Sequence, residues 1–409
     1  MSIPTGPLFF HKKDKGILLS KLKMIVIHYG EIGIKGRNRS MFENMLLRNI
    51  KKALEGEIET ARKEHGRIIL EEKEKIDRGL IKERLQKIPG IENFSFAMGT
   101  NLDIGEIKKM SVEMARKKNF HTFKVATKRA NKKFPLPSIK VNEEVGKEIK
   151  ERMGKDVNLS NPDFTIFIEI GERNAYIYDE KIPAMGGLPV GSQGNVVSLL
   201  SGGIDSPVAS YFMIKRGCKV IFLHFYNENM VSSPAKVEEI IEKLTEYQVE
   251  SKAYIIPFGE LQYAVISSIP SRYRMIVYRR VMARVANEVA IKEKAHAIIT
   301  GDSMGQVASQ TVENLGCIYE ASSLPVLPPL IGMDKREIVD MAKKIGTYEI
   351  SIKPYDDCCS FMVAKHPATR ASIEKIKEME KRLEFFPDEL LEKGEIKYFS
   401  IRKRKRRGT

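Results

Sequence analysis

Hydrophobic and polar positions follow two periods along the chain, and the changes from one to the other divide it into strands and helices. In the second half, short apolar runs alternate with segments of helical spacing. The predicted strands there are 196–200, 219–224, 252–257 and 297–301, and the predicted helices are 206–215, 235–247 and 271–294. Because strands that alternate with helices form parallel sheets with right-handed crossovers, this half predicts a doubly wound α/β domain.

The first half mixes the same elements in smaller units. The predicted strands are 24–29, 67–71, 94–98, 122–127, 164–170 and 174–178, and the predicted helices are 42–54, 81–88, 104–117 and 141–153. Mixed short elements of this kind predict small α+β modules. A stretch rich in glycine and proline, 182–195, separates them from the second half, and we place the main domain boundary there.

The composition is that of a folded protein, with 42% hydrophobic and 30% charged residues. No apolar run reaches the roughly 18 residues of a membrane span, and the N-terminus lacks the pattern of a secretory signal. The sequence therefore predicts a cytoplasmic protein with no membrane partner. The chain has 4 cysteines, with Cys358 and Cys359 adjacent, and they match neither a disulfide framework nor a C-x-x-C zinc site. We expect reduced thiols.

The net charge of +16 gives a surface that attracts polyanions. Nucleic acid is the partner this favours; a Lys/Glu-rich surface of the kind found in heat-adapted proteins is the alternative. One basic stretch begins in strand 122–127 and ends at an aromatic residue and two prolines. Its candidate RNA-backbone contacts are Lys124, Lys128, Arg129, Lys132 and Lys133. A merely solvated face would carry the same charges.

A strand-to-helix junction in the second half carries the motif SGGIDS, Ser201 to Ser206. A helix N-terminus at the carboxyl end of a parallel strand offers unpaired N–H groups and a partial positive charge, and two glycines let the backbone close around an oxyanion. The motif thus predicts a phosphate-binding loop, in which Asp205 would hold a Mg²⁺ ion that bridges phosphates. A turn followed by an Asp or Ser helix cap, which needs no ligand, is the alternative.

Two other phosphate-binding motifs, G-x-x-x-x-G-K-[ST] and G-x-G-x-x-G after a strand, are absent from the sequence. SGGIDS instead resembles the PP-loop of ATP pyrophosphatases, which split ATP between the α and β phosphates and adenylate a substrate. Further segments narrow the resemblance to the tRNA 4-thiouridine synthetases, sulfurtransferases also tied to thiamine synthesis. These segments are LLSGGIDSPVA, LHFY, YRRVMARVA, TGDSMGQVASQT, LPVLPPLIGMDKREIVDMAKKIGTYEIS and, similar to that family's THUMP domain, TFKVATKRANKKFPLPS.

The resemblance runs from about Met24 to Arg370 and implies three modules after an N-terminal extension. The extension is 1–23, a ferredoxin-like α+β domain is 24–80, a THUMP RNA-binding domain is 81–185, and the PP-loop ATP pyrophosphatase domain is 186–409. By resemblance, the ATP ligands are Leu199, Leu200, Ser201, Gly202, Gly203, Asp205, Ser206, His224, Phe225, Arg279, Gly301 and Gln310. An arginine on a helix that faces a phosphate loop also suits a charge clamp on the transition state, although a surface arginine would look the same.

The family places a catalytic cysteine in the stretch that matches PYDDCCSFM, so the resemblance implies Cys358 or Cys359, together with Asp205, as catalytic residues. A thiolate is strongly nucleophilic and carries persulfide sulfur, whereas two small residues that merely fill a loop are the alternative. Longer members add a rhodanese domain, and this chain matches the short form. Sulfur is then expected from a cysteine desulfurase, from free sulfide, or from a thiolate-held iron–sulfur cluster.

The function implied is ATP-dependent tRNA sulfurtransfer: adenylation of uridine 8 at its C4 oxygen, followed by replacement of that oxygen with sulfur. Family members usually pair as homodimers, with tRNA recognised by shape and phosphates. Two alternatives stay open. A PP-loop ligase that uses ammonia would need neither cysteine, and a tRNA-binding module with a relic ATP site would need no Asp205.

Overall fold

The computed structural model describes residues 22–229, 234–354 and 364–401, and the contacts between Cα atoms divide them into two compact units. One unit contains residues 22–26, Ile69–Glu74 and Ser95–Lys181. The other contains Ile27–Ile68, Lys75–Phe94 and the described residues from Ile182 onward.

The first half of the described chain builds one 9-stranded sheet with the order β2-β3-β1-β4-β8-β7-β5-β6, to which β9 adds by pairing with β4. The strands are β1 (Leu22–His28), β2 (Ile58–Glu64), β3 (Arg67–Glu72), β4 (Asn93–Thr100), β5 (Thr122–Arg129), β6 (Asp156–Val157), β7 (Phe164–Ile170), β8 (Ala175–Tyr178) and β9 (Ile182–Pro183). The helices are η1 (Glu31–Ile34), η2 (Gly36–Asn38), α1 (Arg39–Ala53), α2 (Arg78–Gln86), α3 (Ile104–Arg116) and α4 (Ser138–Met153).

Helices α3 and α4 pack on one face of the β5–β7–β8 part of this sheet. The Asp103 side chain accepts a hydrogen bond from the N–H of Glu106 and so fixes the start of α3. The two helices and the strands share one hydrophobic core, in which Phe123 of β5 and Ile166 of β7 are fully buried. Alternation along β5 leaves Lys124 and Lys128 on the opposite face.

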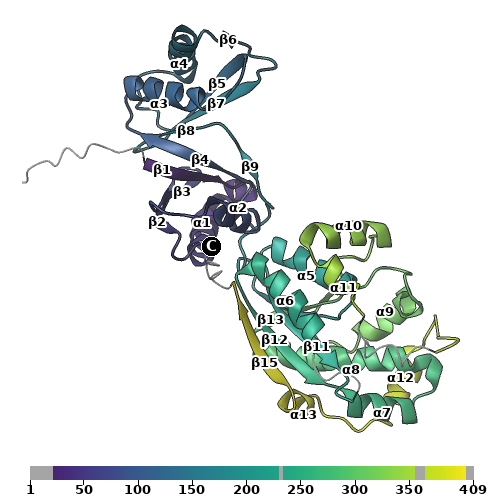
Figure 1. Cartoon of the computed structure of the whole chain (residues 1–409). Coiled ribbons are helices and arrows are strands. Elements are labelled where there is room, and N and C mark those ends of the chain that lie inside the picture. Colours follow the sequence, from purple (N-terminus) through teal and green to yellow (C-terminus); the bar gives the residue numbers. More distant parts are fainter. Residues whose placement is uncertain (1–21, 230–233, 355–363, 402–409) are drawn as a thin grey trace, which may run out of the picture. The chain divides into compact units, whose positions relative to one another are not determined.

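The second half forms a six-stranded sheet with the order β14-β13-β10-β11-β12-β15 (Figure 1). Its strands are β10 (Asn195–Leu199), β11 (Lys219–Tyr226), β12 (Glu250–Pro257), β13 (Ala295–Ile299), β14 (Val326–Leu327) and β15 (Glu395–Ser400). The first five pair in parallel, whereas β15 pairs antiparallel with β12 at the edge.

Helices cover both faces of this sheet. One face packs against α5 (Asp205–Lys215), α6 (Ala235–Gln248), α10 (Lys335–Ile345) and α11 (Tyr348–Ser351). The other packs against α7 (Gly259–Ser268), α8 (Ser271–Lys292), α9 (Val312–Tyr319), α12 (Ile373–Glu380) and α13 (Pro387–Glu392), with η3 (Ala308–Gln310) just before α9. Each face has its own hydrophobic core, so the parallel sheet is buried on both sides.

The observed elements confirm the doubly wound α/β fold predicted for the second half and the α+β character of the first. Strands β2, β6, β9, β14 and β15, helices α7 and α9 to α13, and the short helices η1 to η3 were not predicted. The strand expected at 297–301 begins earlier and ends at Ile299. No helix within the described ranges is long and apolar enough to cross a membrane.

Candidate nucleotide-binding site

The SGGIDS motif lies where the strand order of the parallel sheet reverses. The chain leaves β10 toward β11 on one side, whereas β13 pairs with the other side of β10. Ligands of open α/β sheets bind in the crevice outside the carboxyl ends of the strands at such a point. The loop after β10 and the segment Thr300 to Asp302 after β13 therefore face one another at the expected place.

The loop from Ser201 to Ser206 is closed by its own hydroxyls. The N–H of Ser201 donates to Oγ of Ser206 over 2.9 Å, and the two serine Oγ atoms are 3.1 Å apart. Helix α5 then begins at Asp205, and Pro207 falls within its first turn, where a missing N–H costs little. The Ser210 hydroxyl donates to the Ser206 carbonyl over 2.9 Å and ties the loop to the helix. The loop is thus preformed.

Gly301 packs directly against the start of α5. A Cβ atom at this position would lie 2.7 Å from the Ser206 N and 2.9 Å from its Cα, closer than real contacts allow. Only glycine therefore lets the end of β13 approach the phosphate loop this closely.

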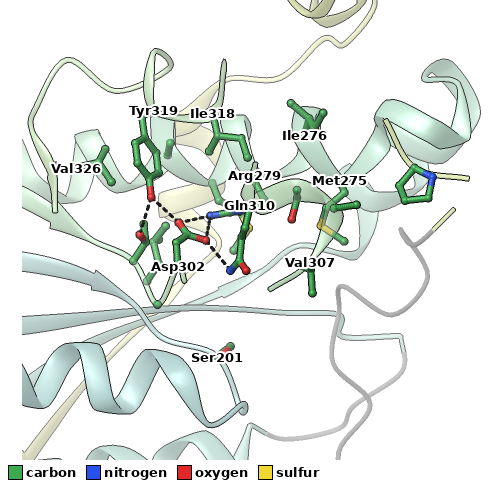
Figure 2. A pocket seen from close by; sticks show the side chains of 18 of the residues that line it. Ser201, Met275, Ile276, Arg279, Asp302, Val307, Gln310, Ile318, Tyr319 and Val326 are labelled. Atoms are coloured by element: carbon green, nitrogen blue, oxygen red, sulfur yellow. Dashed lines mark hydrogen bonds and ion pairs between the residues drawn. The ribbon is translucent and has the colours of Figure 1, made fainter. Parts of the chain in front are cut away.

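A pocket of about 390 Å³ opens beside the loop. The predicted ATP-binding residues that line it are Leu199, Ser201, Asp205, Ser206, Arg279, Gly301 and Gln310. Apolar side chains of α8 and α9, among them Met275, Ile276 and Ile318, form much of the remaining wall (Figure 2). An apolar wall beside a phosphate loop suits the flat ring of a nucleotide base.

The other predicted ATP-binding residues lie outside this lining. Leu200, His224 and Phe225 are buried, and Nδ1 of His224 lies 2.9 Å from the Leu200 carbonyl oxygen. The Phe225 ring packs against Phe258 with the ring centroids 4.6 Å apart. Gly202 and Gly203 belong to the loop itself, where the Gly203 N–H donates to Oγ of Ser201 over 3.3 Å.

The Asp205 carboxylate has two partners at the pocket. Lys335 Nζ lies 2.5 Å from one carboxylate oxygen, and Nε2 of Gln306 donates to the other over 3.0 Å. A capping box between Asp334 and Glu337 fixes the start of α10 and hence the position of Lys335. Neither Lys335 nor Gln306 was predicted, because only the fold brings them to the loop.

Asp302 is a buried residue of the pocket lining and was also not predicted (Figure 2). Its carboxylate accepts hydrogen bonds from Nη2 of Arg279 and from the hydroxyl of Tyr319, the latter over 2.8 Å. Burial raises the pKa of Asp302, but the charge and hydrogen bonds of Arg279 outweigh burial and hold the pKa below its usual range. Burial, followed by the charge of Asp302, raises the pKa of Tyr319.

Arg280, the next residue of α8, points away from this cluster. Its side chain is 1% exposed and forms ion pairs with Glu380 of α12 and with Glu320, over 2.8 and 3.0 Å. It also donates to the Cys317 carbonyl. Arg279, rather than Arg280, is therefore the arginine of α8 at the pocket.

The candidate RNA contacts on β5 and the following loop divide into two groups. Lys128, Lys132 and Lys133 are exposed. Lys124 donates to the Leu159 carbonyl over 3.1 Å, and Nη1 of Arg129 donates to two carbonyls of the loop from Phe134 to Leu136. Arg129 therefore shapes the basic loop.

Cys358 and Cys359 lie outside the described residues. Cys218 and Cys317 are buried, and burial raises the pKa of both thiols. Neither buried thiol has the low pKa that marks a reactive cysteine.

The fold and the loop at its switch point define a nucleotide-binding α/β domain of the PP-loop class, preceded by α+β modules. Residues 191–385 match the family model "Thiamine biosynthesis protein (ThiI)", residues 24–95 match the ThiI ferredoxin-like domain, and residues 102–180 match the THUMP domain. A relative from Caldanaerobacter subterraneus, named a probable tRNA sulfurtransferase, is 42% identical over 90% of this chain and 99% of its own length. The chain belongs to the ThiI family.

Solved structures agree with this assignment. A 4-thiouridine synthetase in complex with RNA and ATP superposes with a TM-score of 0.84 at 37% identity, covering 93% of this chain and 100% of that one. A protein from Pyrococcus horikoshii superposes with a TM-score of 0.65 at 27% identity, covering 80% of this chain and all of that one.

Proposed function

We propose that this protein is an ATP-dependent tRNA sulfurtransferase that converts uridine 8 of tRNA to 4-thiouridine and also supplies sulfur for thiamine synthesis. The observation that carries the proposal is that Ser201, Ser206, Arg279 and Gln310 line one pocket at the switch point of the parallel sheet, in the region that matches the ThiI family model. Family relatives named tRNA sulfurtransferase and a 4-thiouridine synthetase bound to RNA and ATP support it.

The first step activates the uracil C4 oxygen. That oxygen attacks the α-phosphorus of ATP, the bond to the β-phosphate oxygen breaks, pyrophosphate leaves, and the N3 proton passes to solvent. The preformed Ser201–Ser206 loop at the N-terminus of α5 binds the phosphates through backbone N–H groups, and Arg279 and Gln310 orient the nucleotide. Leu200, His224 and Phe225 at the strand ends are proposed to complete the ATP-binding set, as the resemblance implies.

Mg²⁺ at phosphate sites usually takes one or two carboxylates and completes its shell with phosphate and water oxygens, and the carboxylate of Asp205 at the pocket fits that requirement. The ion would neutralise charge on the phosphates. Lys335 and Gln306 hold the two oxygens of Asp205 and so fix the carboxylate that would bind the ion.

The second step replaces oxygen with sulfur. A sulfur nucleophile attacks C4, and AMP leaves with the former C4 oxygen. Cys358 or Cys359 carries this sulfur as a persulfide supplied by a cysteine desulfurase, and its outer sulfur forms the bond to C4. A second thiol then attacks the cysteine sulfur, so that a disulfide forms, the sulfur–sulfur bond to the inserted atom breaks, and the sulfur stays on C4. An external thiol reductant restores the carrier cysteine for the next turnover. Free sulfide and a thiolate-held iron–sulfur cluster are the other sulfur sources to be tested.

The N-terminal modules hold the tRNA. Lys128, Lys132 and Lys133 contact its phosphates, Lys124 and Arg129 shape the surface that presents them, and the protein acts as a homodimer. We assign 24–95 to the ferredoxin-like domain and 102–180 to the THUMP domain, so the boundary between them lies later than the expected residue 80, and we assign 186–409 to the catalytic domain.

A reconstituted assay tests the function. Purified protein, unmodified tRNA, Mg-ATP and either sulfide or a cysteine desulfurase with cysteine are combined, and 4-thiouridine is measured by its near-ultraviolet absorbance. Wild type should form it only with ATP, and Asp205→Asn should not. Comparison of Cys358→Ser with Cys359→Ser assigns the sulfur-carrying thiol. Full activity of the double serine variant with both sulfur sources would exclude the cysteine route.

A further inference from the structure

The pocket contains a carboxylate to which the proposed reaction assigns no role. Asp302 follows β13 and is 3% exposed. A buried carboxylate beside a site for a polyanion is unfavourable on electrostatic grounds, because it repels the phosphates and loses its own hydration. Other contacts must therefore offset the free energy that burying this charge costs.

The compensation includes three donors from three different elements. Nη2 of Arg279 in α8 donates over 2.8 and 2.7 Å to the two carboxylate oxygens, Nε2 of Gln310 in η3 donates over 3.0 Å, and the Tyr319 hydroxyl in α9 donates over 2.8 Å. Figure 2 shows the three side chains converging on the one carboxylate. All three also line the pocket.

The pair of Asp302 and Arg279 has no net charge. Arg279 therefore acts on a bound nucleotide mainly through the direction of its N–H groups, and less as an excess positive charge. Charge-assisted hydrogen bonds of this length fix the planar guanidinium in one orientation. The carboxylate is what sets that orientation, because it is the acceptor common to the three donors.

We propose that Asp302 is a positioning residue for the nucleotide site. Its carboxylate holds Arg279, Gln310 and Tyr319 in the orientations in which they bind ATP. The 4-thiouridine assay that tests this inference rests on the proposed function, whereas the ATP-binding measurement does not. Asp302 is assigned no proton transfer and no contact with the reacting atoms.

The protein offers a matched control in a second ion pair, whose arginine lies on the same helix, α8. Glu380 is a buried carboxylate that pairs with Arg280, the residue next to Arg279, outside the pocket lining. Asp302→Asn and Glu380→Gln each remove one negative charge from a buried ion pair with α8 while keeping the side-chain shape. A merely structural role for Asp302 predicts that both variants lose stability and neither changes the response to ATP.

The test measures ATP binding by calorimetry, kcat and KM for ATP in the 4-thiouridine assay, and thermal unfolding of the full chain. Loss of one charge-assisted hydrogen bond should raise the ATP Kd of Asp302→Asn about tenfold, and misplacement of the donors should lower kcat/KM about 100-fold. Glu380→Gln should bind ATP like wild type. In an Arg279→Gln background, Asp302→Asn should cost less than about tenfold in kcat/KM, since its main partner is gone.

Three results would overturn the inference: an Asp302→Asn protein with wild-type Kd and kcat/KM, losses that multiply fully in the double variant, or an equal rise in Kd for Glu380→Gln. If Asp302→Asn does not fold, Tyr319→Phe takes its place, with an expected rise in Kd of about threefold and an unchanged Kd as the contrary result. Wild-type protein that binds ATP but makes no 4-thiouridine would count against the proposed function, while the calorimetric comparison would still decide the role of Asp302.

Discussion

Two neighbouring arginines of α8 have opposite surroundings. Arg279 reaches the nucleotide pocket and pairs with Asp302, whereas Arg280 is buried against Glu380 and Glu320 beneath the pocket wall. Adjacent helix positions point about 100° apart, so one helix serves two purposes. The first pair can exchange partners with a ligand, and the second fastens α12 and the end of α9 to α8. The same residue type thus serves function in one place and folding in the other.

Replacing Arg280 should have the largest effect, and the effect should be on stability. Arg280→Met leaves the Glu380 carboxylate buried with only Arg284 as a cationic partner among the ion pairs of the described residues. Removing one member of a buried pair costs about 3 kcal/mol or more. Denaturant unfolding should report that loss, while Arg370→Met, whose native side chain is 85% exposed, should cost almost nothing. Equal stability of the two variants would show that the Arg280 network does not fasten the helices.

Replacing Arg279 should mainly affect catalysis. Arg279→Gln removes the oriented guanidinium from the pocket, and loss of one such donor costs about 100-fold in kcat/KM. The 4-thiouridine assay at several ATP concentrations should report it. Because Asp302 keeps hydrogen bonds from Gln310 and Tyr319, the melting temperature should fall less than in Arg280→Met. A wild-type kcat/KM would remove Arg279 from the nucleotide site.

The pair of Asp302 and Arg279 also predicts a pH dependence. The pKa of Asp302 is lower in the folded protein than in an unfolded chain, where it is about 3.9. The stability this contributes is present above the unfolded pKa and is lost as pH falls through the folded value. Unfolding free energy should therefore fall more steeply below about pH 4 in wild type than in Asp302→Asn. Parallel pH curves would contradict the ion pair.

The smallest effect is expected at the exposed rim of the Arg280 network. Lys377 pairs with Glu320 over 2.6 Å, and the two side chains are 51% and 43% exposed. Pairs of this kind contribute about 0.5 kcal/mol or less, and salt screens them. The free energy of unfolding of Lys377→Ala, measured in denaturant, should lie within that margin of the wild-type value. A loss of stability close to that of Arg280→Met would show that the exposed pair contributes as much as the buried ones.

The sequence predicted the strands β10 to β13 and the helix α5, which carry the phosphate loop. The bounds predicted for β7, 164–170, are those observed, and the junction of β10 with α5 was placed within a residue, because a short apolar run followed by two glycines and a helical pattern is a strong local signal. Strands β2 and β15 escaped prediction because their sequences, IETARKE and EIKYFS, are polar or mixed. Tyr398 of β15 is 75% exposed, as an edge position allows.

The contacts within the site were less predictable. Ser201, Arg279, Gly301 and Gln310, which the resemblance implied as ATP ligands, line one pocket, and their contact with ATP stays a prediction. The bonds from Arg279 to Asp302 and from Lys335 to Asp205 join residues from different elements, and no local pattern encodes them. A signal for Asp302 was nevertheless present, since it directly follows Gly301 at the carboxyl end of β13, the strand beside β10.

The most direct test of the account is ATP-dependent formation of 4-thiouridine in unmodified tRNA by wild type and Asp205→Asn, side by side with a saturating sulfur source. The account predicts 4-thiouridine at uridine 8 with wild type and ATP, with one AMP and one pyrophosphate released per sulfur inserted, and none with Asp205→Asn. Equal 4-thiouridine from both proteins, or from wild type without ATP, would contradict the phosphate-loop assignment.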